Sequence, residues 1–224
     1  MHSIVSELKT TFSNRSNKEQ ALWMKGYLRD QYDFYGVKAP ERKALAKQVI
    51  SKTGIPTYKE LFEVVQELWE APEREMQYVA MELCVKYKRH YNESFESLIE
   101  FMITNKSWWD TVDYIAATLT GNYLKKYPER ILPIFKDWSF SDDFWLVRTS
   151  IIFQLKYKDK VDTDLLEDVI QRHAHSNEFF IQKAIGWMLR HYSRTNPKWV
   201  LELVAKQELK PLSKREAIRL INKG

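Results

Sequence analysis

Helix starts spaced 35 residues apart constrain this chain more than any other feature of its sequence. Apolar residues recur at intervals of three and four, glycine and proline are few, and strand-like alternation is absent, which predicts an almost wholly helical chain. Capping residues and a first-turn proline mark the expected starts of four long helices: Pro72, Ser107, Asp142 and Asn177. A period of this length is typical of helices stacked neighbour on neighbour.

Each expected helix carries the same apolar or small stripe, at the positions 4, 7, 8 and 11 residues after its start. This spacing places the stripe on one helical face, which we expect to be buried. Its members are Met76, Val79, Ala80, Leu83, Thr111, Tyr114, Ile115, Thr118, Leu146, Thr149, Ser150, Phe153, Ile181, Ala184, Ile185 and Met188. We therefore predict an all-α fold, a HEAT-like helical-repeat solenoid whose equivalent helices line one concave surface.

The positions 2, 6 and 10 residues after each start lie away from the stripe and are expected to face solvent or a ligand. They are Arg74, Tyr78, Glu82, Trp109, Asp113, Ala117, Phe144, Arg148, Ile152, Phe179, Lys183 and Trp187. In a helical-repeat protein without a binding site at these positions, ordinary polar residues would be expected there, whereas this strip contains aromatic and charged side chains. Exposed aromatic residues in a row indicate a binding surface.

The chain is predicted to form a single domain over residues 1–224, with N-terminal helices in 1–54 and the period most visible from 72 to 224. No apolar stretch approaches the ~20 residues that a membrane span needs, and no signal peptide is recognisable, so we expect a cytoplasmic protein without membrane contact. The single cysteine, Cys84, lies in an apolar run and is interpreted as a buried core residue. The scattered histidines predict no metal site.

A formal net charge of +5 favours a polyanionic partner, because Lys and Arg that neutralise phosphates release counterions. The chain also holds 8 Trp, 12 Tyr and 11 Phe, and aromatic faces beside cations are what base stacking uses. Together these features indicate nucleic acid as the partner.

Two groups of strip residues could carry chemistry. Trp109 and Asp113 are four residues apart on one helix, and an indole beside a carboxylate stabilises positive charge. Lys183, Trp187 and Arg190 share a face of a later helix. From periodicity alone, a structural role stays open: Trp109 could pack under a loop, and Asp113 could pair with a surface cation.

Several stretches carry a resemblance to a known family along the whole chain. They are 36–42 (GVKAPER), 68–75 (LWEAPERE), 106–113 (KSWWDTVD), 145–148 (WLVR), 153–158 (FQLKYK), 179–187 (FFIQKAIGW) and 212–218 (LSKREAI). Together they resemble the bacterial alkylpurine DNA glycosylases of the AlkD type, which are HEAT-like-repeat proteins.

The resemblance implies roles for individual residues. Positions matching Trp109, Asp113 and Trp187 form the catalytic cleft of that family, and the position matching Arg148 holds the DNA backbone beside it. The N-terminal helices look like an additional DNA-facing element of the family. The predicted DNA-binding residues are therefore Arg148, Tyr27, Lys38, Lys183 and Arg190, with Trp23 beside Tyr27.

Lys38 stands where the family has a polar uncharged residue, a departure that bears on contacts to the opposite strand.

The predicted function is that of a monofunctional glycosylase in base excision repair. It would hydrolyse the N-glycosidic bond of cationic N3-alkyladenine and N7-alkylguanine in duplex DNA, leaving an abasic site. We expect no metal, no organic cofactor and a monomeric protein. The alternative is a non-catalytic HEAT-repeat module that binds a DNA structure or a protein on the same strip.

Overall fold

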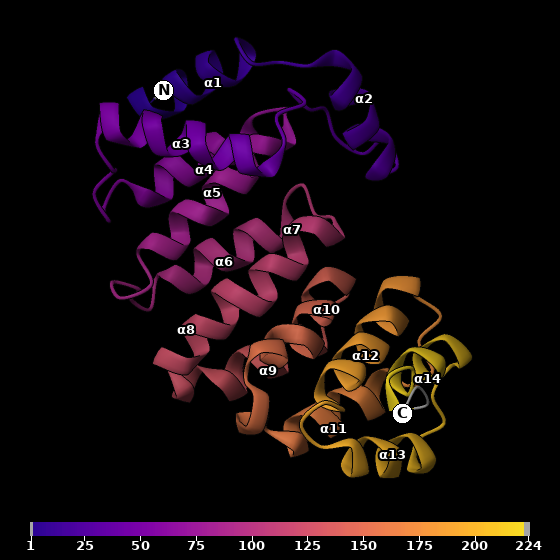
Figure 1. The fold of residues 1–224 in the computed structure, drawn as a ribbon. Coiled ribbons are helices and arrows are strands. Elements are labelled where there is room, and N and C mark those ends of the chain that lie inside the picture. Colours follow the sequence, from indigo (N-terminus) through magenta and orange to yellow (C-terminus); the bar gives the residue numbers. More distant parts are fainter. Residues whose placement is uncertain (1, 222–224) are drawn as a thin grey trace. The chain divides into compact units, whose positions relative to one another are not determined.

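The structure is a computed structural model, and it describes residues 2–221 (Figure 1). These residues form α-helices joined by short turns, and within this range the β-type pairing is one isolated bridge between Asp33 and Glu73. The predicted all-α class is therefore confirmed. Contacts between Cα atoms divide the chain into two compact units, Met1–Asn92 and Glu93–Gly224. A single domain over 1–224 stays a prediction.

The first unit is built on helices that pack through apolar faces, among them the α1 face formed by Ile4, Val5, Leu8 and Phe12. Its helices are α1 (Ser3–Ser13), α2 (Lys18–Tyr27), α3 (Ala39–Thr53), α4 (Leu61–Glu70) and α5 (Arg74–Lys86). In α5 the thiol of Cys84 is fully buried, and burial raises its pKa, so this cysteine is a core residue as expected.

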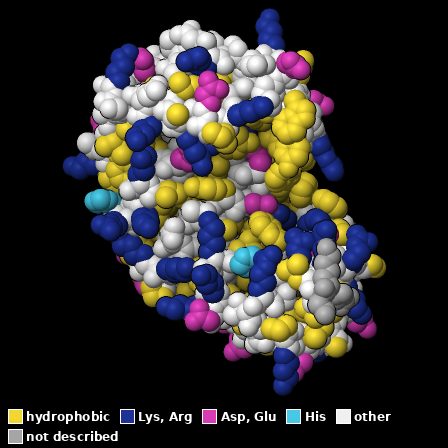
Figure 2. All heavy atoms as spheres, in the orientation of Figure 1, with side chains coloured by type: hydrophobic (Ala, Val, Ile, Leu, Met, Phe, Trp, Pro, Cys, Tyr) yellow, Lys and Arg dark blue, Asp and Glu magenta, His cyan; other side chains and the backbone are white. Residues whose placement is uncertain are grey.

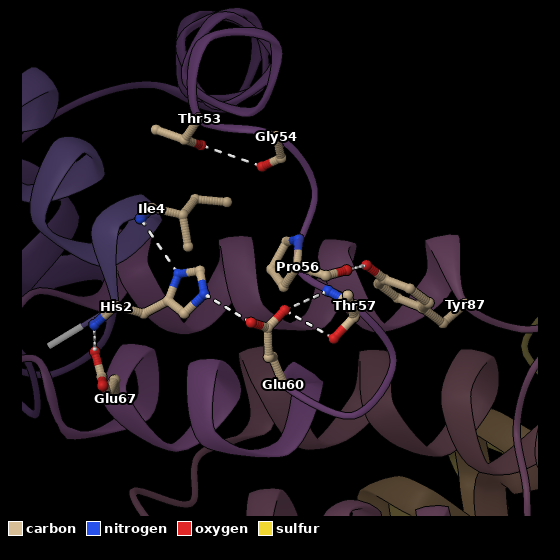
Figure 3. Close-up of polar contacts among 9 residues, drawn as sticks. All are labelled: His2, Ile4, Thr53, Gly54, Pro56, Thr57, Glu60, Glu67 and Tyr87. Atoms are coloured by element: carbon tan, nitrogen blue, oxygen red, sulfur yellow. Dashed lines mark hydrogen bonds and ion pairs between the residues drawn. The ribbon is translucent and has the colours of Figure 1, made fainter.

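Polar contacts fasten the start of α1 to the segments around α4 and α5 (Figure 3). The amide of His2 donates to Glu67 at 2.7 Å, and its imidazole lies 3.9 Å from Glu60. Glu60 also accepts from the amide and hydroxyl of Thr57, at 2.7 and 2.8 Å. The hydroxyl of Tyr87 donates to the carbonyl of Pro56, so the loop before α4 is bound at both ends.

The second unit contains the three later repeats. Its α-helices are α6 (Phe95–Thr104), α7 (Trp109–Tyr114), α8 (Gly121–Lys126), α9 (Ile131–Ser139), α10 (Phe144–Ile152), α11 (Thr163–His173), α12 (Phe179–Tyr192), α13 (Pro197–Lys206) and α14 (Pro211–Ala217). A π-helical segment, Ile115–Thr120, joins α7 to α8.

The predicted period is confirmed, with its origin shifted by two residues. Helices α5, α7, α10 and α12 begin at Arg74, Trp109, Phe144 and Phe179, which are again 35 residues apart. The stripe is buried at every position except Tyr114 and Thr118, which are partly exposed.

The expected caps were wrong by one residue. Trp108, Asp143 and Glu178 precede the helices in place of Ser107, Asp142 and Asn177. Pro72, expected in a first turn, lies outside α5, which begins at Arg74. Asp143 and Glu178 accept backbone amides two residues later, whereas Ser107 donates its hydroxyl backward to Ile103 at the end of α6.

The expected solvent-facing strip is only partly exposed. Arg74, Arg148, Ile152 and Ala117 are buried. Neighbouring segments cover these positions: the guanidinium of Arg74 lies 3.8 Å above the ring of Tyr32. Over the residues that the structure covers, no helix has the length and apolar character needed to cross a bilayer.

A buried carboxylate organises the segment between α2 and α3. Glu75 is fully buried and accepts the amides of Tyr35, Gly36 and Val37 at 3.2, 2.9 and 3.1 Å. Burial raises its pKa, and these three hydrogen bonds oppose that effect.

Gly36 within this segment has φ +86°, and a Cβ there would lie 2.1 Å from the carbonyl oxygen of Asn17. Only glycine fits this approach to the start of α2.

We expect Gly36→Ala to lower the free energy of unfolding by about 3 kcal/mol or more, because the positive φ and the clash with Asn17 add. Gly26→Ala is the matched control: Gly26 lies in α2 with nothing within 4 Å of its added Cβ, so alanine should raise stability by about 0.5–1 kcal/mol. Chemical denaturation measures both, and equal effects of the two substitutions would contradict this account of Gly36.

Candidate functional site

The second unit holds a carboxylate and a guanidinium in a two-point contact. Arg148 Nε donates to Asp113 Oδ1 at 2.7 Å, and Arg148 Nη2 donates to Asp113 Oδ2 at 2.9 Å. Asp113 lies on α7 and Arg148 at the same place on α10, one repeat later. The 35-residue period therefore brings them together, because stacked helices place equivalent positions side by side.

Arg148 is almost enclosed, with 4% of its surface exposed. Its Nη1 donates to the carbonyl of Phe180 in the first turn of α12, so this side chain links three successive repeats. An arginine has five N–H donors. Among the described residues, Asp113 and Phe180 engage three of these N–H groups.

Asp113 lies at the edge of this enclosed region, with 19% of its side chain exposed. Burial raises the pKa of Asp113 above its ordinary value, and the charge and hydrogen bonds of Arg148 work against that rise. Asp110, one helical turn earlier, adds a small rise. The arrangement yields an oriented carboxylate with one side open to a ligand.

An aromatic cluster fixes the starts of α7, α10 and α12. Trp108 contacts Trp145 and Phe180 edge-on, with ring centroids 5.9 and 5.2 Å apart, and Phe144 stacks on Phe180 at 6.1 Å. Trp108 is thus a packing residue. Phe180 was not among the predicted site residues, although its carbonyl binds Arg148 and its ring packs on Trp108.

The two predicted catalytic tryptophans are partly exposed. Trp109 begins α7, one turn before Asp113, and Trp187 lies on α12, two turns after Phe180. Arg148 contacts Asp113 directly. Trp187 lies on α12, the helix whose first turn contacts Arg148 through the carbonyl of Phe180.

A second carboxylate, which was not among the predicted site residues, holds the two predicted DNA-binding cations of α12. Glu216 of α14 contacts Lys183 at 3.1 Å and Arg190 through its other oxygen. Gly186 makes room for it, because a Cβ at Gly186 would lie 2.5 Å from Glu216 Cβ. Burial raises the pKa of Glu216, but Lys183, Arg190 and Arg219 together bring it below its ordinary value.

Position in the sequence gave little signal for Glu216. Its partners lie 33 and 26 residues away in the sequence. The one local feature that indicated a closely packed neighbour is Gly186 on α12.

Tyr27 and Lys38 belong to the first unit. Tyr27 ends α2 with its ring stacked on Trp23, and Lys38 precedes α3 with an exposed side chain. In the part of the chain that the structure describes, no three His, Cys, Asp or Glu side chains gather as a metal site would require.

Dark blue Lys and Arg side chains predominate over acidic ones on the face shown in Figure 2. One cluster of lysines lies in the second unit. Burial lowers the pKa of Lys125, and the nearby charges of Lys160 and Lys156 lower it further. Neighbouring positive charges of this kind attract anions.

Comparison with known proteins assigns the chain to a family. The family model for the DNA alkylation repair enzyme matches residues 8–221. A solved structure, described as a predicted DNA alkylation repair enzyme from Enterococcus faecalis, is 35% identical, with a TM-score of 0.85 over 93% of this chain and 98% of that one. A search of curated proteins gave no match. This chain belongs to the DNA alkylation repair enzyme family.

Proposed function

We propose that this protein is a monofunctional DNA glycosylase that releases cationic alkylated purines, N3-alkyladenine and N7-alkylguanine, from duplex DNA. The observation that carries the proposal is the two-point Asp113–Arg148 pair, which leaves an oriented, partly exposed carboxylate on the strip that also bears Trp109 and Trp187. Membership of a DNA alkylation repair family supplies the substrate class.

The chemistry suits a carboxylate without a general acid. Alkylation at N3 or N7 gives the purine a positive charge, so the base leaves with the electron pair of the C1′–N9 bond and becomes neutral. Positive charge then develops on the sugar, where Asp113 stabilises it. A water attacks C1′, and its proton passes to Asp113 or to solvent, which leaves an abasic site.

Arg148 acts as a positioning residue in this scheme. Its two-point grip fixes both oxygens of Asp113, and its positive charge favours the ionised form of Asp113. Its guanidinium also suits a backbone phosphate next to the lesion. Indole rings at Trp109 and Trp187 would add cation–π stabilisation to the charged sugar.

Asp113→Asn tests the chemical role directly. We expect release of free N7-methylguanine from duplex DNA to fall about 100-fold or more, because asparagine keeps the shape but loses the charge. Binding to undamaged duplex should persist. Asp142→Asn, which neutralises an exposed carboxylate two residues before α10, is the control and should release base at the wild-type rate. Release by wild type no faster than the spontaneous reaction would end the glycosylase proposal.

The pH dependence of release should report Asp113. Base release requires the ionised carboxylate and is lost as pH falls through the pKa of Asp113. Since burial raises this pKa, the loss should begin above the range of an exposed aspartate, about 3.9.

Arg148→Gln removes the opposing charge and should move the acidic limb to higher pH, whereas Arg148→Lys keeps the charge and should move it less. Single-turnover release between about pH 4 and pH 8, corrected for spontaneous loss, measures this. Coincident profiles for wild type and Arg148→Gln would show that Asp113 does not control the rate.

Glu216 should restrain the cations of α12. In Glu216→Gln the side chains of Lys183 and Arg190 are released from their carboxylate, so the slope of log K against log salt for DNA binding should steepen by about 0.9 for each cation that reaches a phosphate. Glu202→Gln, which frees Lys198 from an exposed pair on α13, is the control. An unchanged slope in Glu216→Gln would mean that these cations do not meet the backbone.

A further inference from the structure

A cluster of lysines lies where α8 meets the chain that follows α10. Lys125 is on α8, whereas Lys156 and Lys160 each end a 3-10 turn after α10. All three side chains are exposed, and no carboxylate of the described residues forms an ion pair with them. Asp159 is exposed next to Lys160 but makes no such pair either. The cluster is therefore a concentration of uncompensated positive charge.

The ammonium of Lys125 has a defined position although the residue is exposed. It lies 4.2 Å from the centroid of the Tyr157 ring and donates to the carbonyl of Lys156 at 3.5 Å. The ring itself is fixed, because Tyr157 is buried and its hydroxyl donates to the carbonyl of Gly121 at 2.9 Å. These contacts hold Nζ of Lys125 beside the chain that carries the other two lysines.

A second ammonium of the cluster is also held in place. Lys156 Nζ donates to Thr118 Oγ1 at 2.7 Å and lies 5.8 Å from the centroid of the Tyr114 ring. Both partners are neutral, so the positive charge of Lys156 is oriented without being compensated. An oxyanion that approaches Lys125 therefore meets a fixed second cation.

The surroundings of Lys125 favour its uncharged amine. The face of the Tyr157 ring attracts an ammonium. Partial burial nevertheless lowers the pKa of Lys125, and the nearby charges of Lys160 and Lys156 lower it further. A lysine is a nucleophile only in its uncharged form, and a lowered pKa makes more of that form available at a given pH.

Lys25 gives the contrast within the same chain. It is also partly exposed, but its ammonium pairs with Asp33 at 2.8 Å. This hydrogen bond and the charge of Asp33 raise the pKa of Lys25. The carboxylate also repels an approaching anion, so Lys25 has less free amine and a less favourable local field than Lys125.

We propose that Lys125 is an acylation site for acyl phosphates, with Lys156 and Lys160 binding the phosphate group of the donor. The lone pair of Lys125 Nζ attacks the acyl carbon, so that a C–N bond forms and the C–O bond to phosphate breaks. Phosphate leaves with the electrons of that bond, and the amine proton passes to it or to solvent. The products are an Nε-acyl-lysine, which has lost its positive charge, and inorganic phosphate.

This modification is independent of the proposed function, because it uses no residue of the Asp113 region and no DNA.

Two acetylating reagents separate attraction of the phosphate from reactivity of the amine. The full chain is incubated briefly with acetyl phosphate, which is anionic, or with the N-hydroxysuccinimide ester of acetic acid, which is neutral. Mass spectrometry of chymotryptic peptides gives the initial rate at each lysine, and fragment spectra distinguish Lys125 from Lys126. The ratio of the anionic to the neutral rate should be about tenfold higher at Lys125 than at Lys25, because clustered cations concentrate a counter-ion.

Lys160→Gln tests the role of the cluster without touching the reacting lysine. It should lower the rate ratio at Lys125 by about threefold, because one of the charges that attract the donor is lost. Lys198→Gln is the matched control: it removes the same charge from an exposed position on α13 and should leave the ratio unchanged.

A rate ratio at Lys125 no higher than that at Lys25 would overturn the proposal, as would a ratio that is unchanged in Lys160→Gln. Selective acetylation of Lys125 by the neutral ester alone would also overturn it, since the amine would then be reactive without binding the phosphate.

Discussion

The ion pair between Asp113 and Arg148 is the interaction on which the second unit depends. Burial of a guanidinium with 4% of its surface exposed costs free energy unless a partner is present, and removing one member of such a pair costs about 3–5 kcal/mol. The pair joins equivalent positions of consecutive repeats, and Phe180 adds a contact from the next one. The contacts of Arg148 therefore connect the stacked repeats and at the same time orient the carboxylate of Asp113.

The charges around this pair are distributed unevenly. On α12, Glu216 compensates Lys183 and Arg190, which limits how strongly that helix attracts a polyanion. Near the end of α8, Lys125, Lys156 and Lys160 repel one another. Compensation by Glu216 therefore favours a defined geometry of the α12 cations over non-specific attraction of anions.

The repeat could be predicted from the sequence because local features define its period: the residues at the helix starts and an apolar stripe at helical spacing. It placed the helix starts two residues early, because Asp142 and Asn177 resemble caps as closely as Asp143 and Glu178 do. It could not predict which strip positions are covered, because burial of Arg148 depends on Phe180 from another helix.

Glu216 escaped prediction for a similar reason, since its pairing with Lys183 and Arg190 is tertiary. The repeat register and the family resemblance both pointed to Asp113, and the register explains why Arg148 contacts it.

In the first unit, buried charged side chains hold the segment 32–37, which contributes Val37 to the core. Arg74 and Glu75 are fully buried, and replacing buried charged groups with apolar residues of similar size is often neutral or stabilising. Their contacts converge on residues 32–37, through the ring of Tyr32, the carbonyl of Asp33 and the amides of the following residues. That segment supports α2, which buries no side chain of its own. Stability alone gives no reason to retain such an arrangement, whereas presenting Trp23 and Tyr27 in a fixed orientation does.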